Sequence, residues 1–194
     1  KMSFQKITTT QHGSELVNNV LNLMGNSLNV IVYNFMDMLS HARTEIEVLK
    51  ELAPDERAYR SITASWFEHS PLYEALKKLQ GKTAQIIITT DHGSIRVNDA
   101  TKVVGDRQTS HNLRYKTGKS LQYADKDAFG VRKPEDIKLP SAFVSSEFIF
   151  AKEDKFLVYG NNFNQYANFY RNSFQHGGLS IEEMIVPFAR LLTK

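Results

Sequence analysis

Apolar and polar positions alternate with two different periods in the first part of the chain. Residues 14–26 carry apolar side chains at positions 16, 17, 20, 21, 23 and 24, the spacing of one helical face, with Gly13-Ser14 before them as a cap. Residues 28–35 then form an apolar, β-rich run. The pattern therefore predicts an amphipathic helix followed by a buried strand.

The same order repeats further along. Residues 36–52 read as a helical stretch that is interrupted at Pro54. A second helix is expected over 68–80, because Pro71 is tolerated in a first turn and Gly81 is typical of a helix end. Residues 84–90 follow as a buried strand. This helix–strand–helix–strand order predicts an α/β fold with a doubly wound, mostly parallel sheet and helices on both faces.

Residues 94–140 are polar and interrupted by glycines and prolines, so we expect an irregular insertion with short strands. This insertion holds ten lysines and arginines and six acidic residues, which gives it a net charge of +4. The net charge of the whole chain is only +3. Beside a metal site, such charge favours anionic substrates, although a solvated loop explains most of these residues singly.

The last third of the chain predicts a hairpin, a helix and a final strand. Residues 142–150 and 156–159 flank a polar turn. After Asn161-Asn162, three aromatic residues fall at helical spacing, and they indicate either core packing or base stacking: Tyr166, Phe169 and Tyr170. Residues 180–183 match a capping box, which favours helix capping for both glutamates there, and 185–192 reads as a strand.

Composition bounds the class of protein. The 194 residues, 41% apolar and 23% charged, predict a single globular domain over 1–194. Cysteine is absent, which excludes thiolate metal sites and fits a cytoplasmic location. No apolar run approaches the roughly 20 residues of a membrane span. The chain begins at Lys1 without a signal-peptide pattern, so we expect a segment of a longer protein.

Candidate metal ligands follow two predicted strands. Asp91 and His92 come directly after the strand at 84–90, at the sheet edge where open α/β folds bind ligands, and Gly93 permits a sharp turn behind them. Asp37 and His41 follow the strand at 28–35 and are four residues apart, so they share one helical face. Carboxylate and imidazole are metal-binding groups. A solvated loop explains Asp91 and His92 equally well. For Asp37 and His41 taken alone, a helix-start acid beside a surface histidine is the stronger interpretation.

The order of these motifs resembles the alkaline phosphatase superfamily. Within it the chain is most similar to the PglZ domain, the output half of PorX-type response regulators of Bacteroidetes. Three segments carry the resemblance: NFMDMLSHAR at 34–43, TTDHG at 89–93 and HGGLSIEEMIVP at 176–187. The resemblance covers nearly the whole chain, and it implies upstream receiver and helical domains in the same protein and a homodimer.

The resemblance also implies roles for single residues. Asp37, His41 and His176 would hold one zinc ion, and Asp91 and His92 a second, with manganese as the other candidate metal. An early Asp and a nucleophilic Thr or Ser would complete the second site, and we expect both before Lys1. Thr8, Thr9 and Thr10 are poor substitutes, since no buried strand is evident before them.

Further histidines and basic residues are assigned by chemistry. His111, Arg114 and Lys116 are candidate contacts to an anionic substrate, with an ordinary loop histidine as the other interpretation of His111. His12 and His69 are expected to be structural. The resulting hypothesis is a dizinc phosphodiesterase acting on oligonucleotides or cyclic nucleotides, inactive as the isolated segment. The alternative is a non-catalytic, metal-bound signalling module that acts through partner or nucleotide binding.

Overall fold

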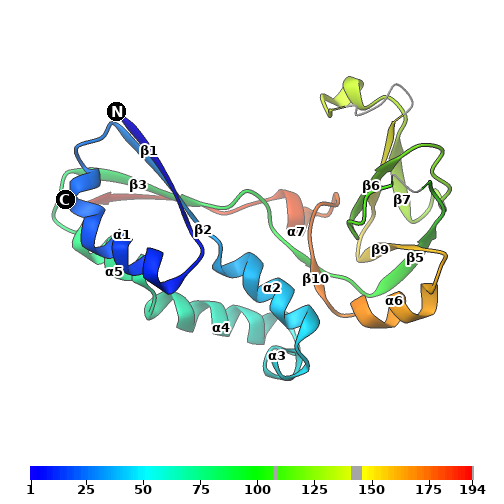
Figure 1. Ribbon diagram of the computed structural model, residues 1–194, viewed down its shortest axis with the longest axis horizontal. Coiled ribbons are helices and arrows are strands. Elements are labelled where there is room, and N and C mark those ends of the chain that lie inside the picture. The colour runs from blue at the N-terminus through cyan, green and yellow to red at the C-terminus, as the bar shows by residue number, and fades with distance from the viewer. Residues whose placement is uncertain (107–108, 141–145, 194) are drawn as a thin grey trace. The chain divides into compact units, whose positions relative to one another are not determined.

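The computed structural model describes residues 1–106, 109–140 and 146–193. The chain divides into two compact units, shown in Figure 1. The first comprises residues 1–89 and the last strand, and the second comprises residues 90–187. The expected insertion at 94–140 lies within the second unit, which also includes residues 146–187. The assignment of 1–194 to a single domain stays a prediction.

The first unit combines two strand pairs with five helices. β1 pairs with β2 in parallel, and β3 pairs with β11 in antiparallel orientation. The elements are β1 Met2–Ile7, α1 Thr10–Leu23, β2 Leu28–Tyr33, α2 Phe35–Glu45, α3 Glu47–Leu52, α4 Glu56–Glu68, α5 Pro71–Lys78, β3 Ala84–Thr89 and β11 Phe188–Thr193. The α/β class is as predicted, but only the first of these two strand pairs is parallel.

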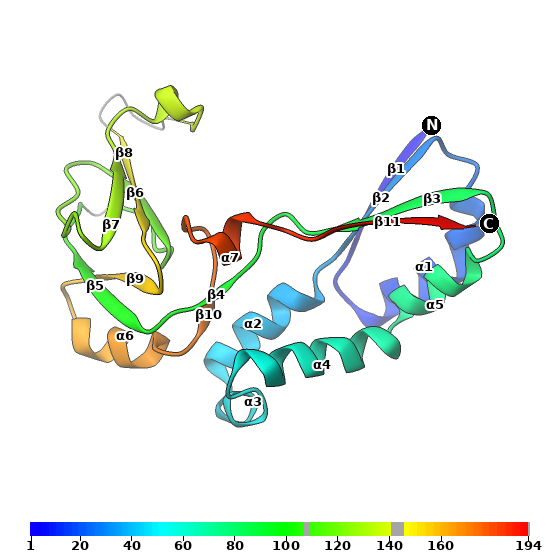
Figure 2. The same cartoon turned by 180° about the vertical axis from the view of Figure 1, so that it is seen from behind.

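The core of the first unit lies on one side of the strands. Helices α1 and α5 pack together on that side, as Figures 1 and 2 show. Ile7, Ile31 and Tyr33 point toward them, because alternate residues of a strand face the same way. They pack with the apolar stripe of α1 and with α5, through Leu16, Val17, Val20, Leu23, Ala75 and Leu79.

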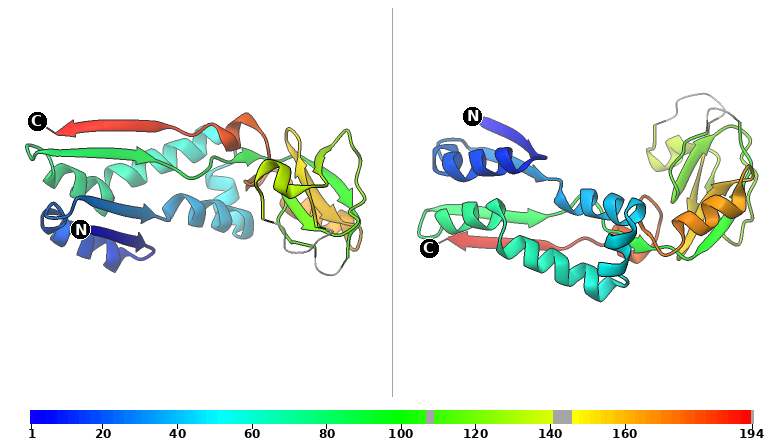
Figure 3. Two further views of the ribbon diagram at one scale, coloured as in Figure 1. Left: turned by 90° about the horizontal axis from the view of Figure 1, so that it is seen from above. Right: turned by 60° about the horizontal axis from the view of Figure 1, so that its bottom comes forward.

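The other side of these strands is apolar and exposed. In register, Met2 lies beside Leu28 and Phe4 beside Val30, and all four side chains are exposed, as is Val32. The left view of Figure 3 shows the strands with the helices behind them. The prediction of fully buried strands at 28–35 and 84–90 is therefore wrong: β2 and β3 are each buried on one face at most.

Several predicted boundaries change for local reasons. Helix α1 begins at Thr10 rather than 14, because the Thr9 hydroxyl caps the N–H of His12 at 3.2 Å. The stretch 36–52 splits into α2 and α3 at Ile46, which has an extended backbone. Helix α4 was not predicted. Helix α5 begins after Ser70, which accepts a hydrogen bond from the Tyr73 N–H at 3.1 Å.

The second unit is built from short strands, as expected for the insertion. Its central ladder is β6-β8-β7, all antiparallel, while β5 pairs with β9 in parallel and β4 with β10 in antiparallel orientation. The elements are β4 Ile95–Arg96, β5 Asp99–Val103, β6 Tyr115–Gly118, β7 Ala128–Val131, the 3₁₀ turn η1 Pro134–Ile137, β8 Glu147–Ala151, β9 Lys155–Tyr159, α6 Phe163–Tyr170, β10 Phe174–Gln175 and α7 Ile181–Met184.

Two predictions for this unit need correction. The expected hairpin is wrong, because β8 pairs with β6 and β7 whereas β9 pairs with β5; residues 142–145 of its first arm lie outside the described residues. The aromatic stripe does lie on a helix, α6, but Tyr166 and Phe169 are each 44% exposed. Of the three aromatic residues, Tyr170 packs against the buried cluster of Val97, Phe156 and Val158.

No helix within residues 1–106, 109–140 and 146–193 has the length and apolar character to cross a bilayer.

Candidate metal centre

In the first unit, Asp37 and His41 face each other across one turn of α2. The strand β2 ends at Tyr33, and Asp37 follows in the first turn of the helix. The His41 Nε2 lies 3.4 Å from the Asp37 Oδ1, and the Asn34 side-chain amide donates to the other carboxylate oxygen at 3.4 Å. Both side chains reach solvent. The expected i, i+4 geometry is present, and it brings together a carboxylate and an imidazole, two groups that bind metal ions.

In the second unit, His92 is oriented by its own turn. Its Nδ1 lies 3.0 Å from the carbonyl oxygen of Gly93. A carbonyl only accepts, so Nδ1 carries the proton and the lone pair of Nε2 is free for a metal ion. Hydrogen bonding of one ring nitrogen to a carbonyl is the usual arrangement in metal-binding histidines. The Thr90 hydroxyl also donates to the His92 carbonyl, at 3.0 Å.

His176 lies against His92. Their rings are stacked, with centroids 3.9 Å apart and planes at 15°. Asp91 precedes His92, its carboxylate is 88% exposed, and its Oδ1 lies 3.8 Å from the His92 Nε2. Three residues predicted from sequence as ligands therefore come from two segments far apart in the chain and meet at one place in the second unit.

Two backbone contacts join these segments. The Gly93 N–H donates to the carbonyl of Glu183 at 2.8 Å. A Cβ at position 93 would lie 1.9 Å from the carbonyl oxygen of Glu182, a distance that no side chain can adopt. Glycine is thus required here for close approach of two backbones, rather than for the sharp turn that the sequence suggested.

A buried ion pair holds the loop that follows His176. Arg114 donates to both carboxylate oxygens of Glu183, at 2.9 and 2.8 Å, and neither side chain is more than 2% exposed. The same carboxylate accepts from the N–H groups of Gly178 and Ser180, at 2.9 and 3.1 Å. Glu183 therefore both completes the predicted capping box and fixes residues 178–183 against the body of the unit.

Charge balance explains how this carboxylate stays ionised. Burial by itself raises the pKa of Glu183. The hydrogen bonds from Arg114 and from the Gly178 N–H, together with the guanidinium charge, lower the pKa by more than burial raises it. The net pKa lies below the ordinary glutamate value. Charged hydrogen bonds on both oxygens are what a buried carboxylate needs.

The three substrate contacts predicted from sequence lie in different surroundings. Arg114 is fully buried and also donates to the Lys155 carbonyl, so its role in the structure is to hold Glu183. Lys116 is 1% exposed, donates to the carbonyls of Ser110 and Asn112, and lies over the Tyr159 ring. Their burial speaks against direct contact with substrate. His111 is exposed, edge-on to the same ring.

The remaining histidines and threonines follow simpler rules. His69 ends α4, with its Nδ1 2.8 Å from the Ser65 carbonyl, which supports a structural role. His12 lies exposed on α1. A strand, β1, does precede Thr8–Thr10, but Ile7 is its one buried residue, so it is not the buried strand that a nucleophile of this fold was expected to follow.

The buried pair was missed by sequence reasoning. Glu183 was singled out by its capping box, but nothing in the pattern links it to Arg114, 69 residues earlier. An arginine in a polar, glycine-rich segment reads as a surface residue, and only the fold shows its burial.

Comparison with known proteins decides the family. The family model for the PglZ domain, described as the BREX system PglZ alkaline phosphatase-like domain, matches residues 1–191. The chain belongs to the PglZ family. The domain predicted from sequence is thus confirmed, and it places this PglZ chain in the alkaline phosphatase superfamily of metal-dependent hydrolases. No match was found among curated proteins.

Solved structures support the fold of the PglZ chain. Sixteen chains match it, among them the phosphonoacetate hydrolase from Sinorhizobium meliloti 1021, solved in complex with phosphonoformate. That likeness has a TM-score of 0.50 at 14% sequence identity, and it covers 94% of this chain and 50% of the hydrolase. The PglZ chain therefore spans about half the length of that enzyme. At this identity the likeness concerns the fold alone.

Proposed function

We propose that the protein containing this PglZ domain is a two-metal phosphodiesterase that uses zinc, with manganese as the second candidate. The observation that carries the proposal is the stacked pair of His92 and His176 beside Asp91, with the His92 Nε2 free to bind an ion. Asp37 and His41 offer a further carboxylate and imidazole. Nitrogen and oxygen ligands of this kind suit zinc.

The family resemblance supports a division of these ligands between two ions. One ion would be held by Asp37, His41 and His176, and the other by Asp91 and His92. Two ions roughly 4 Å apart stabilise both the attacking and the leaving oxygen of an in-line displacement at phosphorus. In this proposal the ligand residues of the PglZ chain bind and position the ions, and His111 contacts the substrate. Arg114 and Lys116 do not touch the substrate; they stabilise the fold around the site.

The nucleophile is proposed to lie outside these 194 residues, with a further acidic ligand. Thr9 supports this assignment, because its hydroxyl accepts the N–H of His12 as a helix cap. The complete fold is then expected to be a mostly parallel sheet with helices on both faces. Receiver and helical domains, a homodimer and a cytoplasmic response regulator remain part of the same proposal, as do oligonucleotide or cyclic nucleotide substrates.

The proposal is tested on the full-length protein with an aryl phosphodiester and defined zinc. We expect Asp91→Ala to abolish turnover while the circular dichroism spectrum stays unchanged, because the variant removes the charge that holds the second ion. Asp136→Ala, an exposed carboxylate in η1, is the matched control and should keep wild-type activity. Wild-type turnover by Asp91→Ala would exclude the two-metal mechanism. Zinc binding without any turnover in the wild type would favour the signalling module.

A further inference from the structure

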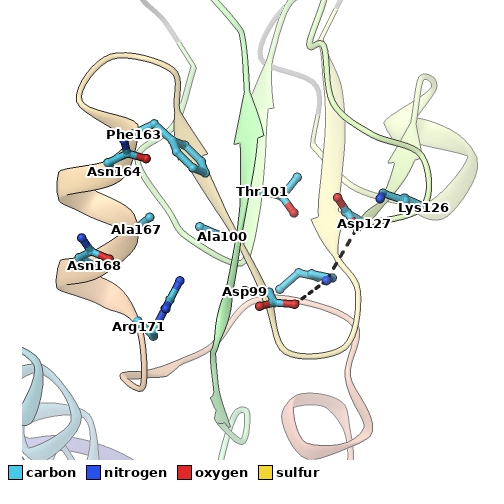
Figure 4. A pocket seen from close by; sticks show the side chains of 11 residues that line it. Asp99, Ala100, Thr101, Lys126, Asp127, Phe163, Asn164, Ala167, Asn168 and Arg171 are labelled. Atoms are coloured by element: carbon cyan, nitrogen blue, oxygen red, sulfur yellow. Dashed lines mark hydrogen bonds and ion pairs between the residues drawn. The ribbon is translucent and has the colours of Figure 1, made fainter.

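The second unit contains a polar pocket that is separate from the residues of the metal centre. It has a volume of about 460 Å³ and lies along α6 and β5, as Figure 4 shows. Two small residues, Ala100 and Ala167, are among those that line it. None of its lining residues is a predicted metal ligand. Its volume is in the range of small-molecule sites, roughly 300–1,000 Å³.

The carboxylates of the pocket are already paired. The Lys155 Nζ lies 2.9 Å from the Asp99 Oδ2 and 3.9 Å from the Asp127 Oδ1. The hydrogen bond with Lys155 holds the pKa of Asp99 below its ordinary value, and the same bond raises the pKa of Lys155. One cation thus serves two carboxylates, so both acidic groups that line the pocket are engaged within the protein.

Two other cations at the pocket are available. Among the described residues, neither Arg171 nor Lys126 forms an ion pair or a side-chain hydrogen bond, and both are exposed. With Lys155 and the two carboxylates they give the lining a net charge of +1. An exposed guanidinium is suited to bind a phosphate through two parallel hydrogen bonds.

The far end of the pocket has different chemistry. Phe163, at the start of α6, packs against the cluster of Val97, Phe156 and Val158 and also lines the pocket, with Asn164 next to it (Figure 4). Phe163 and Arg171 are eight residues apart, about 12 Å along a helix, and both extend into the pocket. An aromatic ring stacks on a nucleobase, and an asparagine amide can pair with a base edge. A phosphate-binding end and a base-binding end therefore lie in one cavity.

We propose that this pocket binds a mononucleotide, with its phosphate on Arg171 and Lys126 and its base against Phe163. The site is independent of the hydrolytic centre, so it holds whether or not the proposed phosphodiesterase activity is found. A mononucleotide bound there is a product or a regulator of the same protein rather than the reacting substrate.

The test is calorimetric titration of the full-length protein, in the presence of a chelator, with a nucleoside 5′-monophosphate. We expect saturable binding that Arg171→Ala weakens by roughly tenfold or more, because a charged hydrogen-bond pair is lost. Ala167→Leu should abolish binding by filling the pocket. Lys133→Ala, an exposed lysine outside the pocket, and Asp91→Ala should bind as the wild type does.

Two further ligands separate the parts of the proposal. Inorganic phosphate and the nucleoside without phosphate should each bind at least about tenfold more weakly than the mononucleotide. Equal binding of either one would overturn the mononucleotide assignment. Absent binding by the wild type, or equal binding by Arg171→Ala, would overturn the site itself; Arg171 is exposed, so this variant is decisive even if Ala167→Leu fails to fold.

Discussion

Glu183 accepts hydrogen bonds from three places, two of them on its buried carboxylate and one on its backbone carbonyl. Arg114 approaches from the start of β6, Gly178 and Ser180 from the loop after His176, and the backbone carbonyl of Glu183 itself accepts from Gly93. One residue thereby links the segment of His92 to the segment of His176. The stacking of the two imidazoles depends on residues that contact neither of them.

Glu183→Gln should be strongly destabilising. It leaves the Arg114 guanidinium buried without a counter-charge, a loss of about 3–5 kcal/mol in the free energy of unfolding. Chemical denaturation of the full-length protein measures this. Glu182→Gln, the exposed neighbour, is the matched control and should change stability by less than about 0.5 kcal/mol. Equal stability of both variants would show that the pair is not buried in solution.

The same pair predicts an acid limit of stability. Since the pKa of Glu183 is lower in the folded than in the unfolded protein, its stabilisation is complete above the unfolded value of about 4.5. That stabilisation is lost as pH falls from there through the lower folded pKa. Unfolding measured between neutral pH and pH 3 should show this loss in the wild type but not in Glu183→Gln.

Lys116 predicts a further rise of stability with pH, in the alkaline range. Burial lowers its pKa to about 8, whereas the unfolded value is 10.5. Between these values the unfolded chain binds more protons, so the contribution of Lys116 to stability rises with pH. The stability of the wild type relative to Lys116→Met should therefore increase from pH 8 to pH 10. A pH-independent difference would place the amine in water.

At the scale of elements, the features predicted correctly from the sequence are those that depend on residues close together in the chain. The i, i+4 pair of Asp37 and His41, the capping box at 180–183 and the helical register of α6 all depend on near neighbours, and all are present. Strand partners depend on distant residues instead. This is why the expected hairpin of β8 and β9 is wrong and why the neighbour of Glu183 was not foreseen.

Within the second unit, the contact of Gly93 with α7 gives a test at this scale. Gly93→Ala places a Cβ where the Glu182 carbonyl stands, so the 182–183 backbone must move. We expect weaker zinc binding by at least about tenfold, as for disturbed outer-shell contacts of metal ligands, together with a lower melting temperature. Gly25→Ala is the control, because its nearest atom would lie 3.5 Å away, an ordinary contact. Unchanged zinc affinity in Gly93→Ala would separate this contact from the metal centre.

At the scale of the whole chain, one face of the first unit remains without a cover. Met2, Phe4, Leu28 and Val30 form adjacent exposed pairs across β1 and β2. Such a face fits the proposal that further parts of the protein complete the sheet. Exposed apolar sheet surfaces of this kind promote association.

The 194-residue chain alone should therefore associate in solution and show negligible phosphodiesterase activity at saturating zinc. A mispositioned nucleophile lowers the reaction rate about 100-fold, and a missing nucleophile should lower it more. Phe4→Glu with Val30→Lys, a cross-strand pair on the exposed face, should lower the association seen in sedimentation without restoring activity. Lys77→Glu with Glu74→Lys on α5 is the control, and it should associate as the wild type does. A monomeric and active wild-type chain would place the nucleophile within these residues, with Thr8–Thr10 at the end of β1 as the first positions to substitute.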